Sequence, residues 1–219
     1  MTAIPVLVGQ YDSPFVRRVA VTLHHYGMTF ERRVLSTFAD FDAMQALSPL
    51  GKVPVLVLED GEPLWDSRAI LDVLHRRAEP ARRLLPDDEA PRRRVLRIEA
   101  AAVGLAEKSV DRAYEVARRA PGTQDPAHMA RVECQIAATL AWLAAADPAP
   151  YFLGETFSIA DVTAAVALTY LREKLPQLCA IGAHPALDRH HAMCEALPAF
   201  RAAAYSAAEA ARSGWRPET

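Results

Sequence analysis

The chain has 219 residues, of which 51% are hydrophobic and 24% are charged, and its formal net charge at pH 7 is −2. This size fits one large domain or two small ones, and the composition is ordinary for a soluble globular protein. The balanced charge argues against a nucleic-acid partner, and the longest apolar stretch, 162–171, is too short to cross a bilayer, so no membrane partner is expected.

The first eighty residues alternate between short apolar runs and helical patterns. The expected elements, in chain order, are a strand at 4–8, a helix at 14–26, a β-prone segment at 29–35, a short helix at 41–47, strands at 55–58 and 63–65, and a helix at 68–76. Gly27 is expected to end the first helix, and Asp60-Gly61 predicts a hairpin turn. The order predicts a small α/β domain over residues 1–80.

After residue 78 the pattern changes to a proline-rich polar linker and then to long segments rich in alanine and leucine. No convincing strand follows the linker. Asp125-Pro126 is typical of a helix N-cap followed by proline at the first helical position. Residues 90–219 are therefore predicted to form an all-helical domain, with helices at 92–120, 126–146, 159–174, 186–196 and 199–211.

Cysteine use and the start of the chain predict a cytoplasmic protein. Cys134, Cys179 and Cys194 are odd in number and form no CxxC pair, which is typical of reduced thiols. Residues 1–5 lack the basic start and apolar core of a signal peptide.

Three short motifs in the first seventy residues carry the candidate chemistry, and Ser13 belongs to the first, Ser13-Pro14-Phe15. Ser13 stands between a predicted strand and a helix, so its simplest role is that of an N-cap. Its hydroxyl could also donate a hydrogen bond to a thiolate, which the free N–H groups at a helix start would further stabilise. Tyr11 is a second possible donor.

The second motif is Gly51-Lys52-Val53-Pro54, just before an apolar strand. Proline cannot donate to a sheet ladder, but it is expected here if the Val53–Pro54 bond is cis and turns the chain. Such a turn could present the N–H and C=O of Val53 to an extended peptide; an ordinary loop proline is the alternative. Lys52 is either a solvated charge or an anchor for a carboxylate.

The third motif, Asp66-Ser67, precedes a predicted helix. Either residue could simply cap it. Free N–H groups at a helix start also bind anions, and an adjacent aspartate can bind an ammonium group. One ligand carbon bearing both a carboxylate and an amine would satisfy both.

Together, these motifs resemble the thioredoxin-like domain of the serine-type, bacterial-like cytosolic glutathione transferases. A later segment, Phe152-Leu153-Gly154 to Asp161, resembles an element of that family's helical domain. The resemblance implies an α/β thioredoxin-like N-terminal domain plus an all-α C-terminal domain, covering nearly the whole chain.

The resemblance also implies roles. Ser13 would activate the glutathione sulfur, while Phe15, Lys52, Val53, Pro54, Asp66 and Ser67 would bind glutathione. Ser48 and Asp66 depart from the family's more usual Asn and Glu, and 36–40 lacks a basic residue that relatives often have. The second-substrate pocket would lie between the domains, near 104–114 and 205–215.

The expected activity is a glutathione transferase that adds glutathione thiolate to a hydrophobic electrophile, as in detoxification, with glutathione as co-substrate and no metal. A glutathione-dependent peroxidase or isomerase and a non-catalytic scaffold are the alternatives. The arginine-rich stretch 76–97 and the resemblance together suggest a homodimer.

Other polar patterns are predicted to be structural. Ser158-x-x-Asp161 has the spacing of a capping box, with Phe157 and Val162 where a hydrophobic staple would place them. His190-His191-x-x-Cys194 lacks a fourth ligand nearby, so metal binding is not expected.

Overall fold

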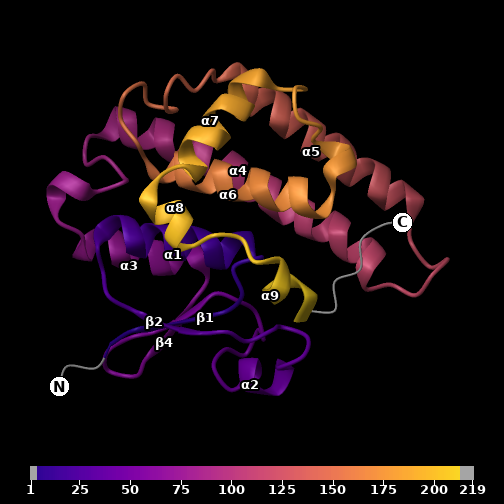
Figure 1. Ribbon diagram of the computed structural model, residues 1–219, viewed down its shortest axis with the longest axis horizontal. Coiled ribbons are helices and arrows are strands. Elements are labelled where there is room, and N and C mark those ends of the chain that lie inside the picture. Colours follow the sequence, from indigo (N-terminus) through magenta and orange to yellow (C-terminus); the bar gives the residue numbers. More distant parts are fainter. Residues whose placement is uncertain (1–3, 213–219) are drawn as a thin grey trace. The chain divides into compact units, whose positions relative to one another are not determined.

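The computed structural model describes residues 4–212, which divide into two compact units (Figure 1). The first unit contains residues 4–83 together with 197–212, and the second contains 84–196. The C-terminal segment therefore groups with the α/β unit, whereas the sequence placed it in the helical domain.

The first unit is built on a four-stranded sheet in the order β2-β1-β3-β4. The strands are β1 (Val6–Val8), β2 (Glu31–Arg33), β3 (Val55–Val57) and β4 (Pro63–Trp65). β1 is parallel to β2 and antiparallel to β3, and β3 is antiparallel to β4. The predicted mixed α/β fold of this region is confirmed.

Helices α1 (Pro14–Tyr26) and α3 (Ser67–Arg77) lie together on one side of the sheet, and the short α2 (Phe41–Gln45) lies at the other (Figure 1). α1 has the predicted bounds: Ser13 is its N-cap, and Gly27 ends it in the left-handed region at φ 69°. Most of α1 is buried, including Val16, Val19 and Leu23, so the helix forms much of the unit's core. A single 3₁₀ turn, η1 (Pro80–Arg82), follows α3.

The predicted helix 199–211 is wrong in one respect, because the chain breaks it in two. α8 (Pro198–Ala202) ends before an irregular stretch at 203–206, and α9 (Ala207–Arg212) follows. The Arg17 guanidinium, buried in α1, donates to the backbone oxygen of Ala203 at 2.7 Å. The Ala203 carbonyl, left free at the helix end, thereby gains a donor, and the bond ties α8 to α1.

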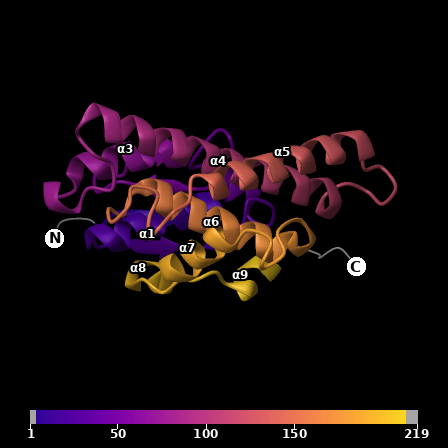
Figure 2. The same cartoon turned by 90° about the horizontal axis from the view of Figure 1, so that it is seen from above.

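The second unit contains α4 (Glu89–Ala117), α5 (Pro126–Ala145), α6 (Ile159–Lys174) and α7 (Pro185–Glu195). α4 packs against both α5 and α6, and the long α4 and α5 run side by side in Figure 2. Nearly every residue of α6 is buried. The all-helical prediction for this region is confirmed; within the described residues, its only β-type pairs are isolated bridges at 151–156.

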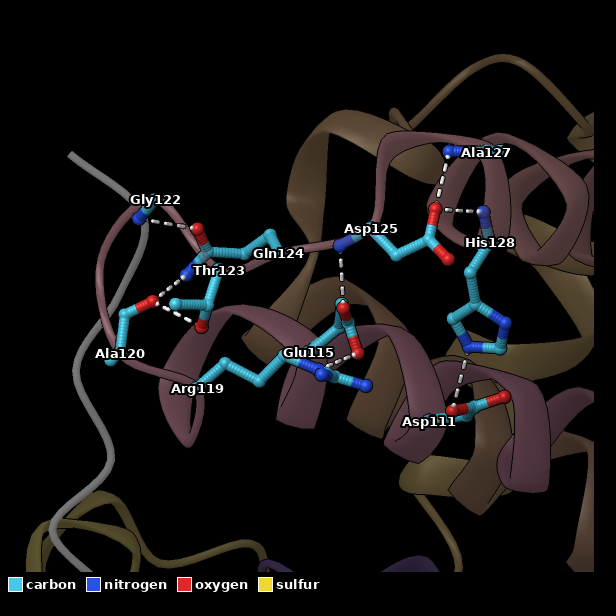
Figure 3. A network of polar contacts seen from close by, with 10 residues as sticks. All are labelled: Asp111, Glu115, Arg119, Ala120, Gly122, Thr123, Gln124, Asp125, Ala127 and His128. Carbon is cyan, nitrogen blue, oxygen red and sulfur yellow. Dashed lines mark hydrogen bonds and ion pairs between the residues drawn. The ribbon is translucent and has the colours of Figure 1, made fainter.

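The connection from α4 to α5 is held by two carboxylates (Figure 3). Asp125 is the N-cap of α5, as predicted, and accepts from the N–H groups of Ala127 at 2.9 Å and His128 at 3.1 Å. Glu115, on the last turn of α4, accepts from the Asp125 N–H at 2.8 Å and from Arg119 at 2.6 Å. The two carboxylates thereby fix the turn between the helices.

Candidate functional site

Sheet register brings the three sequence motifs to one edge. Val8, the last residue of β1, pairs with Val55, the first residue of β3, and Val55 pairs with Trp65, the last residue of β4. These pairings put the end of β1, the start of β3 and the end of β4 side by side. The three motifs adjoin these strand ends, so they meet at one edge of the sheet: Ser13 follows β1, Val53-Pro54 precedes β3, and Asp66-Ser67 follows β4.

Gly9 shows how closely two of these segments approach. It has φ 132°, and a Cβ placed there would lie 2.5 Å from a methyl carbon of Val16 and 3.0 Å from Cβ of Val53. Any larger residue would push the start of α1 away from the Val53 turn. The glycine lets the Ser13 and Val53 segments pack together.

Ser13 ends a tight turn and begins α1. Its N–H donates to the Gln10 carbonyl at 3.1 Å, and its hydroxyl oxygen accepts from the Val16 N–H at a long 3.4 Å. The side chain is partly exposed, and its hydroxyl donates to no group within residues 4–212. The hydroxyl hydrogen can therefore be given to a ligand while the oxygen still caps the helix.

The Val53–Pro54 peptide bond is cis. Pro54 is buried, Val53 is partly exposed, and neighbouring Lys52 is exposed. Because β3 begins only at Val55, the backbone of Val53 precedes the sheet ladder, where it can pair with an added extended segment.

Asp66 has an unusual backbone for a residue with a side chain, φ 71° and ψ 124°. Its carboxylate accepts from the Arg68 N–H at 2.8 Å, and it remains exposed, whereas Ser67 is buried at the first position of α3. A positive φ in a non-glycine residue costs of order 1–3 kcal/mol and is found preferentially at functional sites.

Phe15 lies on the first turn of α1 and is partly buried. Ser48, which stands where the family more often has Asn, is buried, and its hydroxyl accepts from the Leu50 N–H at 3.3 Å. This residue therefore closes the loop before Lys52 by a local bond.

Sequence reasoning missed a polar cluster beside Ser13, which we call the Glu209 cluster: Gln10, Tyr11, Arg32 and Glu209. The Glu209 carboxylate accepts from the Tyr11 N–H at 2.8 Å, and each of its oxygens lies 3.0 Å from Nη2 of Arg32. Gln10 donates its side-chain N–H to the Glu209 carbonyl. The partners are about 180–200 residues apart in sequence, so no local pattern could have revealed them.

The Tyr11 side chain completes the cluster. Its ring packs against Arg32, whose Cζ lies 3.4 Å from the ring centroid. The residue is 4% exposed, and its phenol oxygen is buried without a hydrogen-bond partner in the described part of the chain. Burial raises the pKa of Tyr11, an effect that the Arg32 charge opposes and the Glu209 charge reinforces, so the hydroxyl stays protonated.

A different polar network lies in the second unit. Asp161 is fully buried and accepts from the N–H of Phe152 at 2.9 Å, from the N–H and hydroxyl of Ser158 at 2.8 and 2.7 Å, and from Nε2 of His190 at 2.9 Å. The predicted capping box is present.

Asp161, His190 and Cys194 have the residue types of a catalytic triad, with an acid, a base and a nucleophile. Cys194 Sγ lies 3.6 Å from His190 Nε2, but all three residues are buried. Burial raises the pKa of the Cys194 thiol far above its usual range, and the Asp161 charge raises it further. Because the thiolate is the nucleophile, this cysteine is inert and the three residues are structural.

In the part of the chain that the structure describes, no group of three or more His, Cys, Asp or Glu residues is placed to hold a metal ion. No helix among the described residues is long and apolar enough to cross a membrane.

Comparisons with known proteins identify the family of the chain. Residues 7–82 match the family model of the glutathione S-transferase N-terminal domain, and residues 126–202 match that of the C-terminal domain. A relative in Escherichia coli strain K12, described as the uncharacterized GST-like protein YibF, is 39% identical over 115 residues, covering 52% of this chain. The match spans only 56% of that relative's length.

Solved structures match over more of the chain. A glutathione S-transferase from Methylobacillus flagellatus KT with glutathione bound is 30% identical with a TM-score of 0.85, covering 92% of this chain and 100% of that one. A family member from Pseudomonas fluorescens Pf-5 with bound glutathione is 31% identical with a TM-score of 0.83, covering 92% and 99%. The same family member with bound S-(propanoic acid)-glutathione is 32% identical with a TM-score of 0.78, covering 92% and 97%. The chain belongs to the glutathione transferase superfamily.

Proposed function

We propose that this protein is a glutathione transferase that binds glutathione at the edge of the β2-β1-β3-β4 sheet and adds its thiolate to a small electrophile with an apolar body. The observation that carries the proposal is the convergence of three motifs at that edge, fixed by the Val8–Val55–Trp65 register. Family membership and the glutathione bound in two relatives support it.

In this proposal the Ser13 hydroxyl donates to the glutathione sulfur and favours the thiolate, because a charge-assisted hydrogen bond stabilises the anion more than the thiol. The first N–H groups of α1 act in the same direction. Phe15, on the first turn of α1, borders the sulfur position.

The rest of glutathione would extend along the same edge. The Val53 backbone, positioned by Pro54, pairs with the cysteinyl residue, and Lys52 contacts the glycine carboxylate. Asp66 binds the γ-glutamyl ammonium group, while the buried Ser67 at the start of α3 binds the adjacent carboxylate.

The second substrate is not defined by these contacts. One relative binds a glutathione whose sulfur bears propanoic acid, which supports a small sulfur substituent in this family. We also propose that the protein acts in detoxification in the cytoplasm as a homodimer. Light scattering at micromolar concentration should give a mass near twice 24.0 kDa; the monomer mass would contradict the dimer.

Calorimetry with glutathione tests the proposal against a scaffold role. We expect saturable binding in the micromolar to millimolar range and loss of that binding in Ser67→Trp, which fills the start of α3. No binding at millimolar glutathione would favour the scaffold. Parallel assays with an electrophile and an organic hydroperoxide then distinguish a transferase from a peroxidase that uses the same thiolate.

A further inference from the structure

The Glu209 cluster has the composition of a carboxylate-binding site that the chain itself occupies. Its donors are the Tyr11 N–H, 2.8 Å from the Glu209 carboxylate, and the Arg32 guanidinium, 3.0 Å from each carboxylate oxygen. A guanidinium with a backbone N–H is a strong carboxylate receptor, because both donors are fixed in direction and one is charged.

The receptor is built on rigid parts of the fold. Arg32 belongs to β2, and Leu7 of β1 pairs with it, so its backbone position is set by the sheet. Its guanidinium lies against the Tyr11 ring at 3.4 Å, and a cation held over an aromatic face is attracted by the ring. The sheet and the Tyr11 ring therefore both hold the Arg32 guanidinium beside the Glu209 carboxylate.

Glu209, which occupies this receptor, lies on a less rigid element than Arg32. Glu209 belongs to α9, a helix of six residues that follows an irregular stretch. An isolated helix of this length is not stable by itself, so α9 depends on its contacts for its position. The Arg32 and Glu209 side chains are 31% and 17% exposed, so solvent reaches the pair and a competing carboxylate can approach it.

The receptor adjoins the candidate catalytic residue. Tyr11 is an inner residue of the turn that the Gln10 carbonyl and the Ser13 N–H close at 3.1 Å. Tyr11 is 4% exposed, and its hydroxyl oxygen is buried with no hydrogen-bond partner among the described residues. A buried donor without a partner calls for an explanation, and a polar ligand bound at this turn would supply one.

We propose, on the basis of the proposed function, that Arg32 and the Tyr11 N–H bind a carboxylate of the second substrate, and that Glu209 occupies their site until this substrate displaces it. The second substrate is thus a small electrophile that carries a carboxylate near the carbon attacked by sulfur. Glu209 acts as an internal competitor that keeps the receptor formed and restricts it to acids.

Competition by a tethered group has a measurable signature. A carboxylate on the same chain acts at an effective concentration of roughly millimolar, so it weakens a soluble acid without affecting an uncharged analogue. Removing the Glu209 charge should therefore strengthen binding of the acid alone. A residue that only anchored α9 would instead weaken both ligands when replaced.

The test is calorimetry of the full chain with three ligands: glutathione, S-(propanoic acid)-glutathione, and the same conjugate with the acid replaced by its primary amide. The last two differ by one charge at nearly constant size. The wild type, Arg32→Gln and Glu209→Gln are compared, with Arg33→Gln as the matched control, since neighbouring strand residues point to opposite faces.

We expect the wild type to bind the acid more tightly than the amide, and Glu209→Gln to raise this ratio roughly three- to tenfold, as for a partly exposed charge-assisted pair. Arg32→Gln should bring the ratio near one while leaving glutathione affinity unchanged, and Arg33→Gln should keep the wild-type ratio. Thermal melting within a few degrees of the wild type verifies folding of each variant.

Three results would overturn the inference alone: an unchanged acid-to-amide ratio in Arg32→Gln, an unchanged or lower ratio in Glu209→Gln, or an equal loss of all three ligands in Arg32→Gln. The last result would show that Arg32 holds a carboxylate of glutathione itself. Failure of every variant to bind glutathione or its conjugates would instead overturn the proposed function, and the inference with it.

Discussion

The sheet edge of the first unit and the Asp161 network of the second use the same local device for different ends. Ser13 and Ser158 are both N-caps that precede a helix, and each belongs to a motif that resembles one of the glutathione transferases. At Asp161 every partner is within the chain and the carboxylate is fully buried. At Ser13 the side chain is partly exposed and the hydroxyl hydrogen is unused within residues 4–212.

The difference shows that motif chemistry alone does not separate a structural cap from a cap that we propose to act in catalysis. The exposure of the side chain and its unused hydrogen-bonding capacity separate the two kinds of cap. A buried polar group that is fully bonded stabilises one fold, whereas a group with an unused donor costs stability until a ligand binds. Replacement of the two kinds of residue should therefore change different measurements.

The largest effect is expected at Asp161. Asp161→Ala leaves buried donors from Phe152, Ser158 and His190 without an acceptor, and each unsatisfied buried donor costs about 1–3 kcal/mol. We expect a loss of roughly 3 kcal/mol or more in the free energy of unfolding, measured by denaturant titration, or failure to fold at 37 °C. The folded fraction should keep its glutathione affinity.

Asp161→Asn is the matched, milder variant, because it keeps the size and one acceptor. Folded Asp161→Asn could instead lose glutathione affinity clearly while its denaturant midpoint stays unchanged. That result would show that the network serves binding, and it would contradict the contrast between the Asp161 network and the Ser13 site.

Ser13 should show the opposite behaviour. A hydrogen bond to a charged group contributes roughly 1.5–3 kcal/mol, so Ser13→Ala should lower turnover about ten- to a hundredfold near neutral pH. The melting temperature should change little, because the cap bond at 3.4 Å is long. Steady-state conjugation rates from pH 6 to 9 measure the effect.

The pH profile gives the direction of the defect. Without the hydroxyl, less of the bound glutathione is thiolate, and much of the loss should return at alkaline pH, where the thiol ionises unaided. Ser13→Cys, with a thiol at a helix start, should gain thiol–disulfide exchange with glutathione and lose conjugation. Full neutral-pH activity in Ser13→Ala would assign the thiolate to another donor, with Tyr11 the first to test.

Local signals predicted most of the fold. Proline at the first helical position, Gly27 and Asp125 set helix ends that agree with the structure within a few residues, because caps act over one turn. The helix predicted over 199–211 failed because its alanine-rich sequence favours a helix throughout, whereas tertiary bonds such as Arg17 to Ala203 end α8 early.

The candidate site was predictable only where it is local. Ser13, Val53-Pro54 and Asp66-Ser67 are short motifs, and the strand order that brings them to one edge follows from a known resemblance. Arg32 and Glu209 meet across 177 positions, so their pairing depends on where the C-terminal segment folds back. Of the second-substrate region expected at 205–215, residues 213–215 lie outside the described residues, while Glu209 lies beside the Ser13 turn.

Tyr11 offers a smaller and more discriminating test of the comparison. Its hydroxyl has no partner in the described chain, so Tyr11→Phe removes a buried, unsatisfied group and should stabilise the free protein by about 1 kcal/mol. If a ligand completes this donor, the same variant should lower turnover several-fold. Thermal melting with and without glutathione conjugate, beside conjugation rates, measures both. A destabilised Tyr11→Phe would show that the hydroxyl is already bonded.

The smallest effect is expected from lowering the pH, which acts on the turn between α4 and α5. This turn is hydrogen-bonded like the Asp161 network, but its outer side is exposed to solvent. The Asp125 N–H lowers the pKa of Glu115, with Arg119 acting in the same direction, and the His128 N–H lowers the pKa of Asp125. A carboxyl whose folded pKa is depressed stabilises the fold above its ordinary pKa, and this contribution is lost as pH falls through the folded pKa.

Glu115→Gln should therefore lower the melting temperature at pH 7, and its difference from the wild type should shrink toward pH 3. Asp111→Asn, on the same face of α4, serves as the matched control (Figure 3). A difference that stays constant from pH 7 to pH 3 would mean that the Glu115 charge contributes nothing to the turn and that its hydrogen bonds alone hold it.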